Sequence, residues 1–357
     1  MESILVFRLE HFQACFIVAF LTEKEVEMRG ERGGKFLRMV SVVAVSFLFC
    51  TLLSRASLAA QEDFPKKEIT FVVNYGPGGA RDNLARGIGT VMSKYLNVPI
   101  VVMNVAGSGG ALGYSKVYNS APDGYTLGIG AATEVIQQLI EKQDYDVRKF
   151  TYIGKAEHSP VFWFVKSESP LRTLKDFKTF GKTVRQSSFG MTTNATVTAI
   201  IIAEREGFPL TVVGGYKGAA DATLALVRGE VEFSAPTQST AMPFVRSNQI
   251  KPMLTFDQKR SPSFPDVPTV AEAGYPDLAM LALDMWFVAP PNVPQARAKI
   301  LEDALMKTLK DPEFLKWAKG AGVEPGPLGA QETTKFVLDL AGFVEKYRTS
   351  IMKYVQK

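Results

Sequence analysis

The sequence predicts an α/β protein with two lobes that are joined by two crossover segments. From Ile69 onward, short runs rich in β-branched residues alternate with longer amphipathic stretches, and the alternation resumes after Pro170. Repeated strand and helix units of this kind are typical of mostly parallel sheets. Between the two parts lie apolar extended runs that end in prolines, 161–170 and 285–294, and proline favours such connections because it cannot join a central ladder.

The alternation assigns each element in chain order. In the first lobe, strands are expected at 69–73, 99–104 and 125–130, and helices at 84–96 and 111–119. In the second, strands are expected at 182–188, 210–215, 231–236 and 250–256, and helices at 194–208 and 219–229. Two further helices, 296–310 and 330–355, are expected to return to the first lobe. Lobe 1 is therefore assigned residues 60–163 plus 286–357, and lobe 2 residues 164–285.

Residues 1–59 have the pattern of an N-terminal extension followed by a signal peptide. A basic stretch that begins at Met28 precedes a predominantly apolar stretch of fifteen residues, Met39 to Leu53. This run is shorter than the roughly 20 residues that span a bilayer, and the small residues Ser57 and Ala59 follow it. We expect cleavage after Ala59 and a mature protein in the periplasm, with an uncleaved membrane anchor as the alternative.

Composition excludes several classes of function. The chain has 41 Lys and Arg against 36 Asp and Glu, and no basic cluster is interleaved with aromatic residues, so no nucleic-acid partner is expected. Both cysteines, Cys15 and Cys50, precede the expected cleavage point. The mature chain is therefore expected to form neither a disulfide nor a thiolate metal site.

Glycine-rich segments follow two of the predicted strands. In the first, Gly76 to Asp82, glycines let backbone N–H groups approach a ligand, and the start of the next helix favours an anion. A simple turn with Asp82 at the helix start is the alternative. The second, 104–110, lacks the Gly-Lys-Ser/Thr of a phosphate-binding loop and the spacing of a dinucleotide site.

A third segment, Ser187 to Asn194, supplies four hydroxyls and an amide at a helix start. One helix cap cannot use them all, which favours a carboxylate ligand held by bonds of about 1.5–3 kcal/mol each, although simple capping is the alternative. Tyr216-Lys217-Gly218 adds a phenol, an ammonium and a further glycine after the next strand.

Catalysis has few candidates in this sequence. His158 is the single histidine after the signal peptide, and no Gly-x-Ser-x-Gly motif is present. We expect no enzyme, no metal and no cofactor. The alternative is a secreted hydrolase that uses a serine from 187–193 with His158 as its base.

Seven short motifs, taken in order, resemble the Bug family, the periplasmic receptors of tripartite tricarboxylate transporters. They are GPGGARDNLAR from Gly76, VVMNVAGSGGALG from Val101, APDGYTL from Ala121, YKG from Tyr216, RGEVE from Arg228, RSP from Arg260 and PDVPTVAEAG from Pro265. The resemblance implies a periplasmic binding protein of the type II kind, a Venus flytrap that holds one solute between its lobes.

The resemblance also implies a set of ligand-binding residues. In lobe 1 they are Pro77, Gly78, Gly79, Asp82 and Thr133, and in lobe 2 they are Ser187, Ser188, Gly190, Thr192, Thr193, Asn194, Tyr216, Gly218 and Asp221. Met191 and Asn194 stand where relatives commonly have serine and histidine, which leaves the ligand's identity open. Arg81 is interpreted as an extra cation that would pair with a second acidic group on the solute.

The expected function is therefore an extracytoplasmic receptor. It would bind a small carboxylate-containing solute and deliver it to the membrane components of a tripartite tricarboxylate-type transporter, and a monomer is expected. A solute sensor that feeds a signalling partner is a further alternative.

Overall fold

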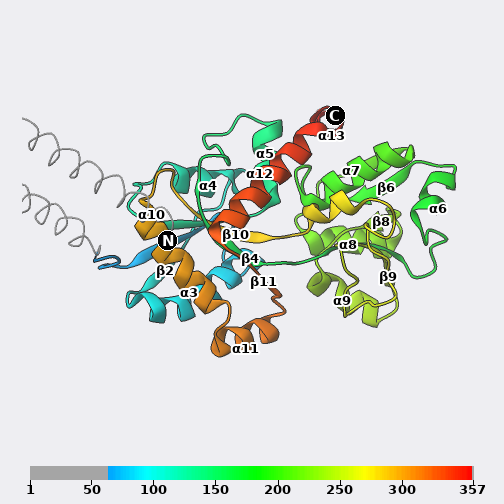
Figure 1. The fold of residues 1–357 in the computed structure, drawn as a ribbon. Helices are drawn as coiled ribbons and strands as arrows, with labels where there is room; N and C mark the ends of the chain where they lie inside the picture. Colours follow the sequence, from blue (N-terminus) through cyan, green and yellow to red (C-terminus); the bar gives the residue numbers. More distant parts are fainter. Residues whose placement is uncertain (1–62, 356–357) are drawn as a thin grey trace, which may run out of the picture. The chain divides into compact units, whose positions relative to one another are not determined.

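The computed structural model describes residues 63–355, and Figure 1 shows the course of the chain. The predicted signal peptide, its cleavage after Ala59 and both cysteines lie outside this range. Residues Phe64–Lys357 form one compact unit. Among the described residues, no helix combines the length and apolarity that crossing a bilayer requires.

The first sheet has six strands in the order β11-β4-β10-β3-β1-β2. Their bounds are β1 Ile69–Val73, β2 Ile100–Asn104, β3 Thr126–Gly130, β4 Thr151–Glu157, β10 Met285–Ala289 and β11 Pro325–Leu328. Strands β1, β2 and β3 are parallel, whereas β10 runs antiparallel to both β3 and β4. The carboxyl ends of the three parallel strands therefore meet at one edge of the sheet.

Helices cover both faces of this sheet, as its continuous apolar strands require. One face packs against α3 (Ala80–Leu96), α10 (Gln295–Thr308) and α11 (Pro312–Ala321). The other face packs against α4 (Ala111–Tyr118), α5 (Ala132–Ile140) and α12 (Ala330–Lys346). A short 3₁₀ turn, η1 (Ser108–Gly110), precedes α4.

The second sheet has five strands in the order β7-β6-β8-β5-β9. They are β5 Val161–Lys166, β6 Val184–Ser187, β7 Leu210–Val213, β8 Phe233–Ser234 and β9 Ile250–Phe256. The accompanying helices are α6 Leu174–Thr179, α7 Asn194–Glu206, α8 Ala219–Arg228, α9 Gln238–Arg246 and the 3₁₀ helix η2 Pro276–Leu281. Strands β6, β7 and β8 are parallel, and β5 is antiparallel to β8 and β9. The predicted two-lobed α/β fold is confirmed.

The two sheets share one arrangement. In each sheet, an antiparallel strand lies beside the set of three parallel strands: β10 in the first sheet and β5 in the second. The chain forms this strand directly after it crosses from the other lobe. The runs predicted as crossovers are therefore interior strands, and the lobe boundaries move by a few residues. Val161 to Trp163, assigned to lobe 1, belong to the second sheet, and Met285, assigned to lobe 2, belongs to the first.

Burial explains this correction. Both β5 and β10 are almost completely buried, so their apolar runs fill the interior of a sheet instead of linking two sheets. The chain instead passes between the sheets at residues 158–160 and 282–284, where Leu283 N donates a hydrogen bond to Ser159 O at 2.8 Å. The prolines come after the strands end.

The tail also differs from its prediction as one helix on lobe 1. It forms α12 and α13 (Arg348–Val355), separated at Tyr347. Helix α12 packs against β4 and α5 of the first lobe. Helix α13 contacts α5 of the first lobe and also α7 of the second lobe. Arg205 of α7 donates from Nε to the Tyr347 hydroxyl at 2.9 Å. The end of the tail therefore contacts both lobes.

Candidate functional site

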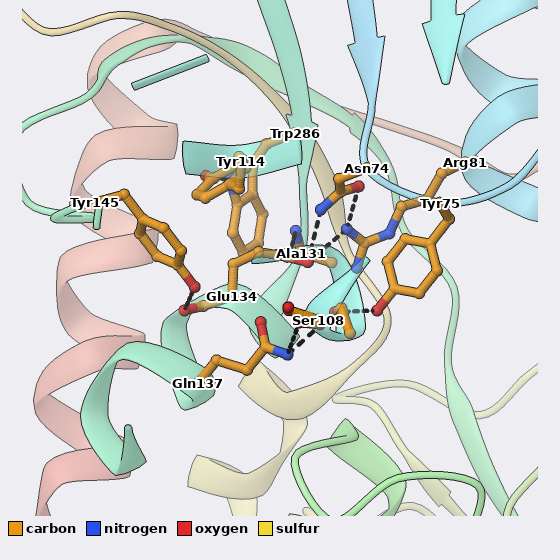
Figure 2. Close-up of polar contacts among 11 residues, drawn as sticks. Asn74, Tyr75, Arg81, Ser108, Tyr114, Ala131, Glu134, Gln137, Tyr145 and Trp286 are labelled. Atoms are coloured by element: carbon orange, nitrogen blue, oxygen red, sulfur yellow. Dashed lines mark hydrogen bonds and ion pairs between the residues drawn. The ribbon is translucent and has the colours of Figure 1, made fainter. Parts of the chain in front are cut away.

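A buried polar cluster lies at the strand ends of the first sheet, where the loops after β1 and β3 meet (Figure 2). Arg81 Nη1 lies 2.7 Å from Glu134 Oε1 and donates to Asn74 Oδ1 at 2.9 Å. Asn74 Nδ2 donates to Glu134 Oε1, and Ala131 N donates to Glu134 Oε2. The Glu134 side chain is 0% exposed and that of Arg81 is 8% exposed, so this ion pair is buried, and both oxygens of Glu134 accept hydrogen bonds.

The electrostatics follow from this pairing. Burial alone would lower the pKa of Arg81, but Glu134 and Tyr75 more than offset it and the pKa is raised. Arg81 therefore stays charged, and its charge is met by Glu134. The prediction that Arg81 is an extra cation for a second acidic group on the solute does not agree with this pairing.

The second glycine loop packs onto the same cluster. Tyr75 donates from its hydroxyl to Gly109 O at 2.7 Å, and Gln137 Nε2 donates to Gly109 O at 3.1 Å. Gly110 has φ +101°, and a Cβ there would lie 2.9 Å from Asn74 Nδ2 and Glu134 Oε1. Only glycine allows the loop to approach this closely. The sequence shows these glycines, but it does not show that they pack against the cluster of Arg81, Asn74 and Glu134.

Asp82 holds the first glycine loop in shape. This residue is 3% exposed, and it accepts hydrogen bonds from Gly78 N at 2.9 Å, Asn104 Nδ2 at 2.9 Å and Arg86 Nε at 3.0 Å. The Arg86 bond, with those from Gly78 and Asn104, lowers the pKa of Asp82 to about 2. Because both carboxylate oxygens have partners in their own lobe, Asp82 positions the loop and is not free to hold a solute.

The remaining predicted residues of lobe 1 fall into two groups. Pro77, Gly78 and Gly79 are exposed, and α3 begins after Gly79 without a side-chain cap. Thr133 is not in a loop but in the first turn of α5, where it is buried. The backbone after β1 is thus open to a ligand, as is the exposed second glycine loop at 107–109.

A small depression lies at the strand ends of the second sheet. It has room for about one water molecule. Its lining comes from the ends of β6 and β8 and from the starts of α7 and α8: Ser187, Ser188, Phe189, Thr193, Ala195, Ala219, Ala222, Ser234, Ala235 and Pro236. Three of the predicted ligand-binding residues, Ser187, Ser188 and Thr193, are among them.

The hydroxyls of this depression already have partners. Ser187 Oγ donates to Ala222 O at 2.7 Å and lies 2.8 Å from Ser234 Oγ. Ser188 Oγ lies 2.6 Å from Thr196 Oγ1 and accepts from Gly190 N at 3.1 Å. Thr193 caps α7 by accepting from Thr196 N, in agreement with the capping alternative. These bonds fix the loop, so the side chains predicted to bind a carboxylate are largely used within the lobe.

Asn194 is not part of the lining of the depression. It is buried, and its Nδ2 donates to Leu281 O at 3.1 Å and Ala282 O at 2.9 Å, near the second connection between the sheets. The role of Asn194 in ligand binding stays a prediction, and these bonds give it a structural role at this connection. The sequence carries no signal for this, because the partners lie more than 80 residues away.

The other predicted residues of lobe 2 surround the depression without lining it. Gly190 and Thr192 are half-buried in the loop before α7, Gly218 starts α8 without a side-chain cap, and Asp221 is exposed in its first turn. Tyr216 is half-buried, and burial raises the pKa of its phenol.

Sequence reasoning missed the aromatic and apolar part of this lining. Phe189 is 47% exposed, and Ser234, Ala235 and Pro236 lie at the end of the third parallel strand. The sequence did carry a signal for residues 234–236, because the segment 231–236 is a predicted strand. The carboxyl ends of parallel strands share one edge of a sheet, so the end of this strand is expected beside the loop after 182–188.

His158 lies at the first connection between the sheets and takes no part in these loops. Its Nδ1 is 2.6 Å from Asp284 Oδ1 and its Nε2 is 3.0 Å from Asp257 Oδ2. Hydrogen bonds to Asp257 and Asp284 raise the pKa of His158 to about 10. Within residues 63–355, no group of three or more His, Cys, Asp or Glu side chains is arranged to hold a metal ion.

Two α/β lobes with loops gathered at the strand ends are the architecture of two-lobed solute-binding proteins. The sequence profile of the tripartite tricarboxylate transporter family receptors (TctC) matches residues 84–351, and the chain belongs to this family of solute-binding receptors. The predicted relationship to the Bug receptors is confirmed.

Individual relatives agree with this assignment. A UPF0065 protein of Bordetella pertussis is 27% identical over 311 residues, which cover 85% of this chain and 93% of that protein. BugT of the same organism is 24% identical over 314 residues, or 85% of this chain and 95% of BugT.

Solved structures show the same fold. A TctC solute-binding protein from Polaromonas superposes with a TM-score of 0.70 at 21% identity, covering 81% of this chain and 99% of that one. MatC from Rhodopseudomonas palustris, with bound malate, has a TM-score of 0.63 at 25% identity and coverages of 82% and 100%. Rpa4515 from R. palustris, with adipate, has a TM-score of 0.66 at 24% identity and coverages of 81% and 98%.

Proposed function

We propose that this receptor works in the periplasm, holds a small carboxylate-bearing solute between its two lobes and delivers it to the membrane components of a tripartite tricarboxylate-type transporter. The observation that carries the proposal is the state of the strand-end loops. Several of their polar side chains, such as Asp82, Ser187 and Ser188, are bonded within each lobe, while α3 and α8 both begin at a glycine without a side-chain cap.

Uncapped helix starts suit a carboxylate. Their first N–H groups have no intrahelical partner, and the helix dipole favours a negative charge there. Gly79 precedes α3 in lobe 1, and Gly218 precedes α8 in lobe 2. A carboxylate that accepted bonds from either start would need no charged side chain, and the malate and adipate bound by MatC and Rpa4515 are solutes of this class.

Geometry argues against the hydrolase alternative. A pKa of about 10 keeps His158 protonated at neutral pH, so it could not accept a proton from a serine. Both ring nitrogens face carboxylates, and Ser187 and Ser188 bond to groups of their own lobe. We therefore propose a binding function without catalysis.

The test begins with the protein expressed from its full sequence and purified from the periplasmic fraction of a Gram-negative host. After removal of co-purified ligand, thermal-shift and calorimetric titrations compare carboxylates of one to three acidic groups, aromatic acids, amino acids and neutral sugars. A solute at 100 times its Kd adds about 2.7 kcal/mol of stability.

One substitution tests the helix start directly. Ala80 is the first residue of α3, where proline is tolerated, so Ala80→Pro removes one backbone N–H and leaves the helix intact. If a carboxylate uses that N–H, affinity should fall about 10- to 100-fold. Gln295→Pro, at the exposed first position of α10, is the matched control and should leave affinity unchanged.

Each outcome separates the alternatives. No binding to any acid by folded, stripped protein would remove the carboxylate proposal. Binding with equal affinity in Ala80→Pro would move the carboxylate away from α3. Capture of a sensor protein in place of transporter components by the loaded receptor would favour signalling over uptake.

A further inference from the structure

Exposed apolar side chains occur at the strand ends of both sheets. Phe189, in the loop after β6, is 47% exposed, Tyr75, two residues after β1, is 36% exposed, and Leu112, beside the second glycine loop, is 54% exposed. Single exposed apolar side chains are common on proteins. Leu112, however, lies in the first turn of α4, and the guanidinium of Arg81 lies 4.5 Å from the centre of the Tyr75 ring. Phe189 is therefore the exposed apolar side chain of these loops that is most available to a ligand.

Phe189 also borders the depression at the second sheet. The rest of that lining is small and apolar, with Ala195, Ala219, Ala235 and Pro236, or consists of hydroxyls that already have partners. The depression is too small for a ring. A ligand ring would therefore lie over its mouth, against the exposed face of Phe189, because aromatic rings prefer stacked or edge-to-face contact.

Charge limits the acidic groups that these loops can take. In the strand-end loops of the described chain and the first turns of the helices that follow them, Arg81 is the one buried cation, and Glu134 neutralises it at 2.7 Å. Lys217 is exposed and screened by water. One carboxylate can be bound by backbone N–H groups at a helix start. With the ring over the depression, a second carboxylate would lie against its small apolar lining and would be desolvated without a cation to pair with it.

We propose that the solute is an aromatic monocarboxylate, with Phe189 as a residue that determines specificity. This inference rests on the proposed function and names the solute class within it. It sets this receptor apart from MatC and Rpa4515, whose bound malate and adipate each carry two carboxylates.

Calorimetric titration of the stripped, periplasm-purified protein tests this with three probes: benzoate, cyclohexanecarboxylate and adipate. Benzoate should bind at least about tenfold more tightly than adipate and several-fold more tightly than cyclohexanecarboxylate, which has no π-face. Phe189→Ala should weaken benzoate about tenfold, and Phe189→Leu should fall between that variant and the native protein. Leu338→Ala, exposed on α12 and part of none of these loops, is the control and should bind benzoate normally.

The outcomes distinguish this inference from the proposed function. Tighter binding of adipate than of benzoate would overturn the aromatic monocarboxylate and leave the carboxylate receptor standing. Equal affinity for benzoate and cyclohexanecarboxylate would overturn the aromatic component, and unchanged benzoate binding in both Phe189 variants would overturn the role of Phe189. Failure of all acids, in the wider panel as well, would overturn the receptor proposal itself.

Discussion

The buried pair between Arg81 and Glu134 gives a sharp prediction about stability. Glu134→Gln keeps the shape of the side chain but removes its charge, which leaves the guanidinium of Arg81 buried without a counterion. The amide of glutamine has one oxygen and one NH₂ group. Its oxygen can accept from either Arg81 or Ala131 N, and its NH₂ group then faces the other donor. Breaking a buried ion pair at one partner costs about 3–5 kcal/mol. In a unit of this size, that corresponds to a fall in Tm of about 6–10 °C.

Urea unfolding and thermal melting measure this cost against a matched exposed pair. Lys94 and Glu313 form an ion pair with side chains that are 54% and 56% exposed, so Glu313→Gln should cost at most about 1 kcal/mol. A second comparison adds Arg81→Met to Glu134→Gln. Because the double variant no longer buries an unpaired charge, its loss should be smaller than the sum of the two single losses.

Two results would refute this reasoning. A loss for Glu134→Gln no larger than that for Glu313→Gln would mean that water or other groups reach Arg81 despite its burial. Strict additivity in the double variant would mean that the two charges do not interact, and the short contact would then be a consequence of packing.

Two further predictions concern single residues. Gly110→Ala should destabilise the fold by about 1–3 kcal/mol because it strains a backbone with φ +101° and crowds Asn74, whereas Gly207→Ala, with φ +72° and open space, should cost less; urea unfolding compares them. Burial and the charge of Asp284 raise the pKa of Glu157 from 4.5 to about 7, so the folded protein binds a proton more tightly than the unfolded chain and loses stability as pH rises from about 4.5 to about 7. Glu157→Gln should therefore be more stable than the native protein by about 3 kcal/mol at pH 8 and equal to it at pH 4, and a difference independent of pH would contradict this assignment.

The elements of the fold could be predicted because they depend on local pattern. Strand β1 and helix α3 follow from a β-branched run, a glycine turn and an amphipathic stretch in direct succession. The prediction for the runs 161–166 and 285–289 is wrong because an apolar extended segment is compatible with both a connection and an interior strand. Their antiparallel neighbours, which decide the matter, lie far away in the sequence: β9 pairs with β5, and β4 pairs with β10.

The site shows the same division between local and distant information. The loops at the strand ends were predictable, since glycines and hydroxyls between a strand and a helix are visible in the sequence. The sequence could not predict which side chains are free to bind a ligand, because their hydrogen-bond partners come from other elements. Ser187 bonds to Ala222 of α8, and Asp82 bonds to Asn104 of β2. A residue type can indicate a binding loop, but its availability depends on tertiary neighbours.

This division bears on how the proposed receptor would recognise its solute. Loops whose side chains are bonded in place have little freedom left to lose, so ordering them on binding costs less than it would for free loops. Recognition then falls to groups that need no ordering, the backbone N–H groups at the starts of α3 and α8 and the exposed ring of Phe189. Under our proposal the N–H groups would serve any carboxylate, so discrimination between solutes would rest on the few side chains, such as Phe189, that are not already bonded within their lobe.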